Sequence, residues 1–234
     1  MKTNHKTRRG FTLVELLVVI VIIAALAGLT APMVIRQRKK ADQTEAVSNA
    51  RQIGLAMFEF ENEYSSYPDA ATAPIVTAAT GSLLTITGAN SNDYFRQLLA
   101  GNFIQTETIF FAKIANAKKP DNNISGAEAL KQGEVGYGYI LNGANGFSAA
   151  GNPARPLVVT PLLNNTTVGT FDPAPFDSKA IVLRMDNSVS SINVRLDNQI
   201  ILGGVSTLLQ TGAGTVWGAI TTAPTLTAPD LKTQ

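Results

Sequence analysis

The chain of 234 residues contains no cysteine. Disulfide bonds are therefore excluded, and no thiolate is present to act as a nucleophile or a metal ligand. Histidine is almost absent too, since His5 is the only one. Beyond position 5 the chain thus lacks the residue types for a Ser-His-Asp or Cys-His catalytic arrangement or a usual zinc site. Because no compact group of carboxylates or lysines stands out either, we predict a protein that is not an enzyme and needs no cofactor.

Charge is absent from a long N-terminal stretch, because the twenty residues from Leu16 to Ile35 include no charged side chain. At about 1.5 Å per residue, such a helix can cross a bilayer. One carboxylate, Glu15, lies inside the apolar run that begins at Phe11. A lone acid near hydrocarbon costs on the order of a few kcal/mol unless it finds a partner. We therefore expect Glu15 to be neutralised by a specific group.

The formal net charge of +2 includes four cations that precede position 10, namely Lys2, Lys6, Arg8 and Arg9. Taking these four from the 19 basic residues leaves 15 against 17 acidic ones, a formal −2 for the remaining chain. No basic stripe remains there, and the pair Lys118-Lys119 is typical of a solvated loop. The sequence predicts no nucleic-acid partner.

The order Arg8-Arg9-Gly10-Phe11-Thr12-Leu13-Val14-Glu15-Leu16, followed by a long apolar helix, resembles the class III leader of bacterial type IV prepilins and type II secretion pseudopilins. The resemblance implies cleavage after Gly10 by a prepilin peptidase and methylation of the new N-terminal Phe11. It also implies that Glu15 occupies the fifth position of the mature chain, where the family has a glutamate. Further partners that it implies are an inner-membrane assembly platform and other copies of the chain.

The spacing is chemically sensible, because cleavage would leave an ammonium group on Phe11, one helical turn from Glu15. Within one chain, or between neighbouring chains, the two charges would satisfy each other. Removing either would leave a buried unpaired charge, at a cost of roughly 3–5 kcal/mol. We predict that Glu15 pairs between subunits and so selects their axial register.

An ordinary secretory signal peptide is the competing interpretation, with Ala25-Leu26-Ala27 as its cleavage site. The apolar run continues to Ile35, which is too long for such a signal. Charge does not decide the orientation in the membrane, because four cations follow the run as well: Arg36, Arg38, Lys39 and Lys40. The resemblance places the leader in the cytoplasm and the rest outside, as a single-pass protein of the bacterial inner membrane with a periplasmic C-terminal domain.

The helix is expected to continue well beyond the apolar run. Pro32 removes a backbone donor and predicts a bend. Apolar residues then recur with helical spacing at Val47, Ala50, Ile53, Met57, Phe60 and Tyr64. We predict one helix from Phe11 to about Tyr64 and four parts: a cleaved leader 1–10, a transmembrane and assembly segment 11–35, its amphipathic continuation 36–66, and an exported β-rich domain 67–234.

In that domain we predict a helix over 92–101 with Asn92 as its N-cap. The predicted strands are Leu83–Thr87, Thr108–Ala112, Tyr137–Leu141, Leu157–Thr160, Lys179–Met185 and Ser191–Leu196. The last two form a hairpin through Asp186-Asn187. The low-complexity end, Thr221–Gln234, is expected to be a mobile tail.

A calcium ion is the one cofactor that the resemblance suggests, because G-type pseudopilins hold calcium in a C-terminal loop. The available acids are Asp172, Asp177, Asp197 and Asp230, but none stands in a recognisable calcium-loop pattern. Solvated loop residues are the favoured interpretation of all four.

These observations together predict an α+β pilin fold, in which a long N-terminal helix packs on a C-terminal antiparallel sheet. The predicted function is that of a structural filament subunit, of a type IV pilus or of a type II secretion pseudopilus. The alternative is a membrane-anchored exported binding domain that never polymerises.

Overall fold

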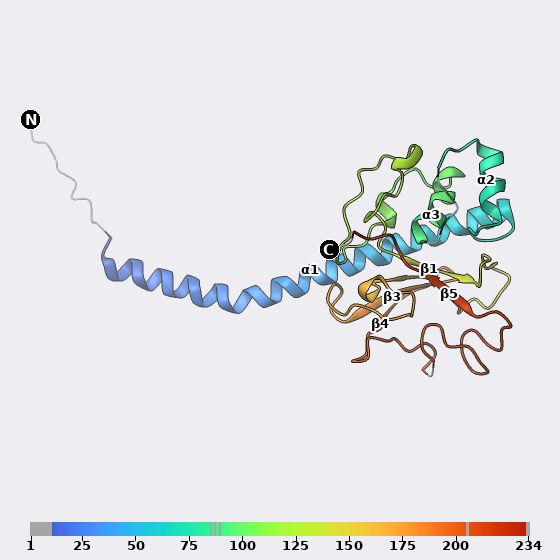
Figure 1. Cartoon of the computed structure of the whole chain (residues 1–234). Coiled ribbons are helices and arrows are strands. Elements are labelled where there is room, and N and C mark those ends of the chain that lie inside the picture. The colour runs from blue at the N-terminus through green and yellow to red at the C-terminus, as the bar shows by residue number, and fades with distance from the viewer. Residues whose placement is uncertain (1–10, 85, 87, 89, 205, 233–234) are drawn as a thin grey trace, which may run out of the picture. The chain divides into compact units, whose positions relative to one another are not determined.

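The computed structural model describes residues 11–84, 86, 88, 90–204 and 206–232. Its helices are α1 (Leu13–Tyr64), α2 (Thr72–Thr80) and α3 (Ser91–Ala100), and its short 3₁₀ helices are η1 (Thr108–Phe110), η2 (Gly126–Glu128) and η3 (Leu163–Asn165). The strands are β1 (Gly138–Asn142), β2 (Pro156–Thr160), β3 (Lys179–Arg184), β4 (Val189–Asn193) and β5 (Pro224–Thr227). A long helix and an antiparallel sheet confirm the predicted α+β, pilin-like fold (Figure 1).

The chain divides into two compact units, 1–39 and 40–234, and α1 begins in the first and ends in the second. In the second unit, α1 buries one face, consisting of Ala46, Asn49, Ala50, Ile53, Gly54, Ala56, Met57 and Phe60. This stripe contains four of the six apolar positions that the helical spacing predicted. Val47 and Tyr64, the other two, are partly buried against the same core. The face predicted from the apolar spacing is thus the face that α1 turns to the core.

The buried face of α1 packs on the sheet (Figure 1). At Gly54 there is no room for a side chain, because an added Cβ would clash with Asn187 Oδ1 and lie 3.1 Å from Leu183 Cδ1 on β3. Eight residues earlier on α1, the Ala46 carbonyl accepts a hydrogen bond from the Tyr137 hydroxyl at 2.9 Å. The helix is therefore held on the sheet by apolar packing and by a buried hydrogen bond.

Two buried tyrosines allow this hydrogen bond to be measured. Tyr137→Phe should lower the free energy of unfolding by about 1 kcal/mol, because a buried hydroxyl loses a partner. Tyr67→Phe is the matched control, since the Tyr67 hydroxyl is equally buried but has no hydrogen-bond partner among the described residues. Removing that hydroxyl should be neutral or stabilising. Urea unfolding of both variants checks the difference, and equal effects would contradict the assignment.

The sheet has the order β4-β3-β2-β1-β5, and all its neighbouring strands are antiparallel. Strand β3 is buried from Ala180 to Leu183, as expected of a strand that is apolar on both faces. The β3–β4 hairpin turns at Asp186-Asn187, with Asn187 at a φ of 60°. The predicted hairpin is thus confirmed, although β4 begins and ends earlier than the predicted strand 191–196.

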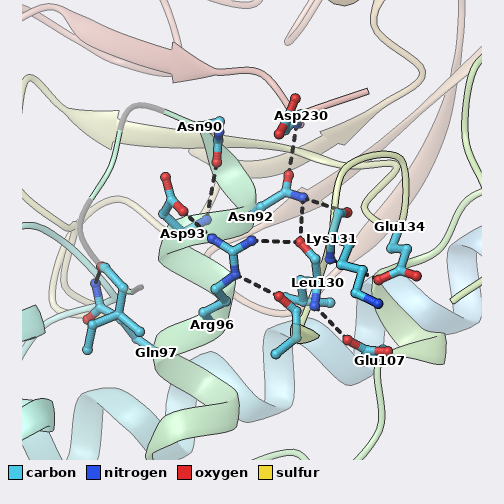
Figure 2. A network of polar contacts seen from close by, with 12 residues as sticks. Asn90, Asn92, Asp93, Arg96, Gln97, Glu107, Leu130, Lys131, Glu134 and Asp230 are labelled. Atoms are coloured by element: carbon cyan, nitrogen blue, oxygen red, sulfur yellow. Dashed lines mark hydrogen bonds and ion pairs between the residues drawn. The ribbon is translucent and has the colours of Figure 1, made fainter. Parts of the chain in front are cut away.

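Several predicted boundaries are wrong. The segment Thr108–Ala112 contains η1 instead of a strand. Asn90 caps α3, its side chain accepting from the Asp93 amide at 3.3 Å. Asn92, the predicted cap, instead donates to the Leu130 carbonyl at 2.9 Å and accepts from the Asp230 amide at 2.8 Å (Figure 2).

The connector after α1 contains helix α2, which was not predicted. Its first turn is held by Asp69, whose carboxylate accepts from the amides of Ala71 at 2.8 Å and Thr72 at 2.7 Å. The strand predicted at Leu83–Thr87 is not found at the residues of this range that are described, and positions 85 and 87 lie outside them.

The C-terminal end also differs from the predicted mobile tail. Strand β5 pairs with β1 over four residues, with Tyr139 opposite Thr227 and Ile140 opposite Leu226. The Leu226 and Leu231 side chains are buried. The Thr227 hydroxyl donates to the Tyr139 carbonyl at 2.9 Å. Residues 224–231 are therefore an edge strand and its extension.

Candidate functional site

The apolar side chains in the first part of α1 are exposed, because no other described part of the chain covers them. Every large hydrophobic residue from Phe11 to Ile35 is between 47% and 81% exposed. This helix is the one among the described residues that is long and apolar enough to cross a membrane, by length and composition alone. Contiguous exposed apolar surface of this extent marks a site of membrane or protein contact. Segment 11–35 is therefore the candidate functional site.

Thr12 and Glu15 form reciprocal hydrogen bonds at the start of this segment. The Glu15 carboxylate accepts from the Thr12 amide at 2.8 Å and from the Thr12 hydroxyl at 2.7 Å. The Glu15 amide donates to the Thr12 hydroxyl at 3.3 Å in return. This is a capping box, which satisfies amide donors that the first turn of a helix leaves open. Glu15 is thus already bound within its own chain.

The capping role of Thr12 was missed from the sequence, although the spacing Thr-x-x-Glu is a signal for it. The capping box bears on the expectation that a specific group satisfies the Glu15 carboxylate. The Glu15 carboxylate has a local partner, Thr12, within its own chain. Pairing between subunits stays a prediction.

The other predicted residues of this segment are placed as follows. Phe11 lies just before α1 and is 81% exposed, whereas Gly10 lies outside the described residues. Pro32 is exposed and lies inside α1, which is helical on both sides of it. The predicted bend at Pro32 and cleavage after Gly10 remain predictions.

The four aspartates considered for calcium are not brought together. The described residues contain one group of three carboxylates with oxygens within 4.8 Å of one another, and it includes none of the four. Asp172 and Asp197 accept from the amides of Ala174 and Gln199, two residues further on. Asp230 accepts from the Gln132 side chain at 3.1 Å. These contacts support the interpretation of three of the four as ordinary loop residues.

Comparison with known proteins identifies the N-terminal segment. A family model described as the prokaryotic N-terminal methylation motif matches residues 5–31. Residues 5–31 are therefore similar to that motif. The resemblance to prepilins and pseudopilins is thereby confirmed. The methylation motif includes Gly10, Phe11 and Glu15, the residues on which the resemblance was based.

Curated relatives are similar to part of the chain. Type II secretion system core protein G of Escherichia coli (strain K12) is 38% identical over 82 residues, which are 34% of this chain and 56% of the relative. The protein of the same name from Dickeya chrysanthemi is 43% identical over 66 residues, 27% of this chain and 42% of the relative. The type IV major pilin protein PilA of Myxococcus xanthus (strain DK1622) is 38% identical over 61 residues, 26% of this chain and 28% of the relative.

The chain spans about half the length of the first of these relatives, and less of the others. No solved structure matches. The relatives bear the names of structural subunits, which agrees with the prediction that the chain is not an enzyme.

Proposed function

We propose that the protein is a structural subunit of a pilus-like or pseudopilus filament, polymerised through the N-terminal part of α1. The observation that carries this proposal is that a methylation motif leads into an apolar helix segment that its own chain leaves exposed. A membrane can cover such a segment while the subunit is stored. In a filament, the same segments of neighbouring chains cover one another, and lipid is no longer required.

The proposal includes the maturation steps that the motif implies. A prepilin peptidase cuts after Gly10, and the new N-terminus, Phe11, is methylated. Before assembly the chain spans the inner membrane once, with the unit 40–234 in the periplasm. An inner-membrane assembly platform then moves it from the bilayer into the filament. The names of the relatives, a secretion-system core protein and a pilin, support both filament types.

Processing is the first test. The mature protein should have the mass of residues 11–234 plus one methyl group. Gly10→Leu should leave the full-length chain in the membrane, because the added side chain obstructs the scissile bond. Gly28→Ala is the matched control, since an added Cβ at Gly28 meets no atom within 4 Å. Intact-mass spectrometry of the membrane fraction gives the result, and a mature start near Gly28 would contradict the proposal.

Fibre recovery is the second test. Shearing or gentle osmotic release should yield the mature chain in a sedimentable filament fraction. A processed chain that stays monomeric in the membrane would instead show the alternative, an anchored binding domain that uses the same leader without polymerising.

A further inference from the structure

Two carboxylates are buried in the long segment between α3 and β1. The side chains of Glu107, just before η1, and Glu134 have 0% exposure. One Glu107 oxygen accepts from the Leu130 amide at 2.5 Å, and one Glu134 oxygen accepts from the Lys131 amide at 2.8 Å. Figure 2 shows that two successive amides thus hold two different acids beside each other.

Each of these acids has a second oxygen for which the described residues provide no hydrogen-bond partner. These atoms are Glu107 Oε2 and Glu134 Oε1, and both are buried. Lys118 Nζ lies 3.6 Å from Glu134 Oε1, which is an ion pair but longer than a hydrogen bond. A buried carboxylate oxygen without a partner is costly, so a native structure that contains two of them requires an explanation.

A third carboxylate completes the group. Asp121 is exposed, and one oxygen each from Glu107, Asp121 and Glu134 lie within 4.8 Å of one another. Calcium binds oxygen ligands at about 2.3–2.6 Å, so two ligands of one ion lie up to about 5 Å apart. The spacing is therefore short enough for a single ion to contact all three acids.

Nearby lysines do not explain the arrangement. Lys131 forms ion pairs with Asp121, at 3.2 Å, and with Glu128, both on the protein surface. Neither this lysine nor Lys118 contacts the unpartnered oxygen of Glu107. Burial raises the pKa of Glu107, and the nearby charge of Glu134 raises it further. The two lysines thus contact Glu134 and Asp121, and no cation among the described residues contacts Glu107 Oε2.

We propose that Glu107, Asp121 and Glu134 bind one divalent cation, with Ca²⁺ as the ion that fits best. The ligands are all carboxylate oxygens, which hard cations prefer. Without histidine or cysteine the site does not suit zinc. Mg²⁺ requires shorter bonds and a nearly ideal octahedron, which three distant positions of one long irregular loop are less suited to provide. This inference lies in the unit 40–234 and does not depend on the filament proposal.

The test is direct measurement of bound ion on the full chain in detergent. After removal of metal with a chelator, equilibrium dialysis against ⁴⁵Ca²⁺ should show about one ion per chain. Asp121→Asn should weaken binding by about tenfold or more, because one of three charged ligands is lost. Glu107→Gln and Glu134→Gln should have larger effects. Glu128→Gln is the matched control and should leave binding unchanged, because Glu128 is a neighbouring acid outside the group.

Glu107→Gln and Glu134→Gln change buried residues and could prevent folding. Asp121→Asn keeps the experiment decisive in that case, because Asp121 is at the surface and its substitution should leave the fold intact. Absence of ⁴⁵Ca²⁺ binding to the wild type at millimolar concentration would overturn the proposal. So would equal binding by wild type and Asp121→Asn. A melting temperature that Ca²⁺ leaves unchanged would overturn it as well.

Discussion

A chain with Glu15→Leu is expected to be processed, inserted and folded like the wild type, yet to be missing from sheared fibres when it is the only subunit. In the filament, the substitution removes the partner of a neighbouring chain's N-terminal ammonium group. That group would then be buried without a counter-charge, at a cost of roughly 3–5 kcal/mol per contact. In a simple membrane anchor, the same change removes a costly acid and should improve insertion.

The capping box makes this experiment sharper, because Glu15 has two roles that different variants separate. Glu15→Gln removes the charge but keeps a side chain that can serve in a capping box. Thr12→Ala removes the hydroxyl partner of Glu15 and costs about 1 kcal/mol of helix stability, yet keeps the carboxylate. Pairing by charge predicts that Glu15→Gln loses fibres and that Thr12→Ala retains them.

Immunoblots of the shear fraction, at matched amounts of membrane protein, provide the measurement. The opposite pattern, with fibres from Glu15→Gln and none from Thr12→Ala, would show that Glu15 serves only to start the helix. Equal fibre recovery from Glu15→Leu and wild type would refute both roles in assembly.

The second large effect is expected at Trp217. Its side chain is fully buried, stacks on Phe147 with ring centroids 5.6 Å apart, and donates from Nε1 to the Leu208 carbonyl at 2.6 Å. The Phe147 carbonyl in turn accepts from the Tyr67 amide, just after the end of α1. Trp217→Ala should lower the free energy of unfolding by about 3–5 kcal/mol, as large buried aromatic truncations do.

Trp217→Phe is the matched control, because it retains an aromatic ring opposite Phe147 and loses the indole donor. Its cost should be clearly smaller than that of Trp217→Ala. Chemical unfolding followed by circular dichroism measures both, because the fluorescence of the single tryptophan disappears in the variants. A loss below about 1 kcal/mol for Trp217→Ala would contradict the packing described here.

The sequence was sufficient to predict features that depend on neighbours along the chain. The apolar positions of α1 recur every three or four residues, so its buried face could be predicted without knowing what covers it. Strand β3 likewise has apolar residues on both faces, which predicts an internal position in the sheet. Gly10, Phe11 and Glu15 lie within six consecutive residues, which explains why the resemblance could be recognised from sequence alone.

Features that depend on contacts between residues far apart in the sequence were missed, because no local pattern indicates such contacts. Strand β5 is rich in threonine and begins with proline, and only its pairing with β1 makes it a strand. Segment Thr108–Ala112 has the composition of a strand, but it forms η1 where Phe110 packs on Phe95, with ring centroids 5.1 Å apart. Helix α2 has a weak pattern of its own, and its first turn relies on Asp69.

The cluster of three carboxylates was likewise missed because it depends on residues far apart in the sequence. Glu107, Asp121 and Glu134 are separated by more than ten residues at each step, so no local spacing connects them. Their proximity follows from the turn at Leu130 and Lys131, whose amides direct both buried acids to one place. A long loop of irregular structure therefore contains the group that sequence patterns could not have indicated.

The bonds between Thr12 and Glu15 have a consequence for how subunits would recognise one another. A free glutamate side chain samples several rotamers, and immobilising it on contact costs about 0.5–1.5 kcal/mol. Here the carboxylate is oriented before any other chain arrives. A cation that approaches α1 thus meets a fixed point near the start of the helix. Because a shift by one residue displaces that point by about 1.5 Å, Thr12 would, in the proposed filament, sharpen the discrimination between correct and slipped alignments of neighbouring helices.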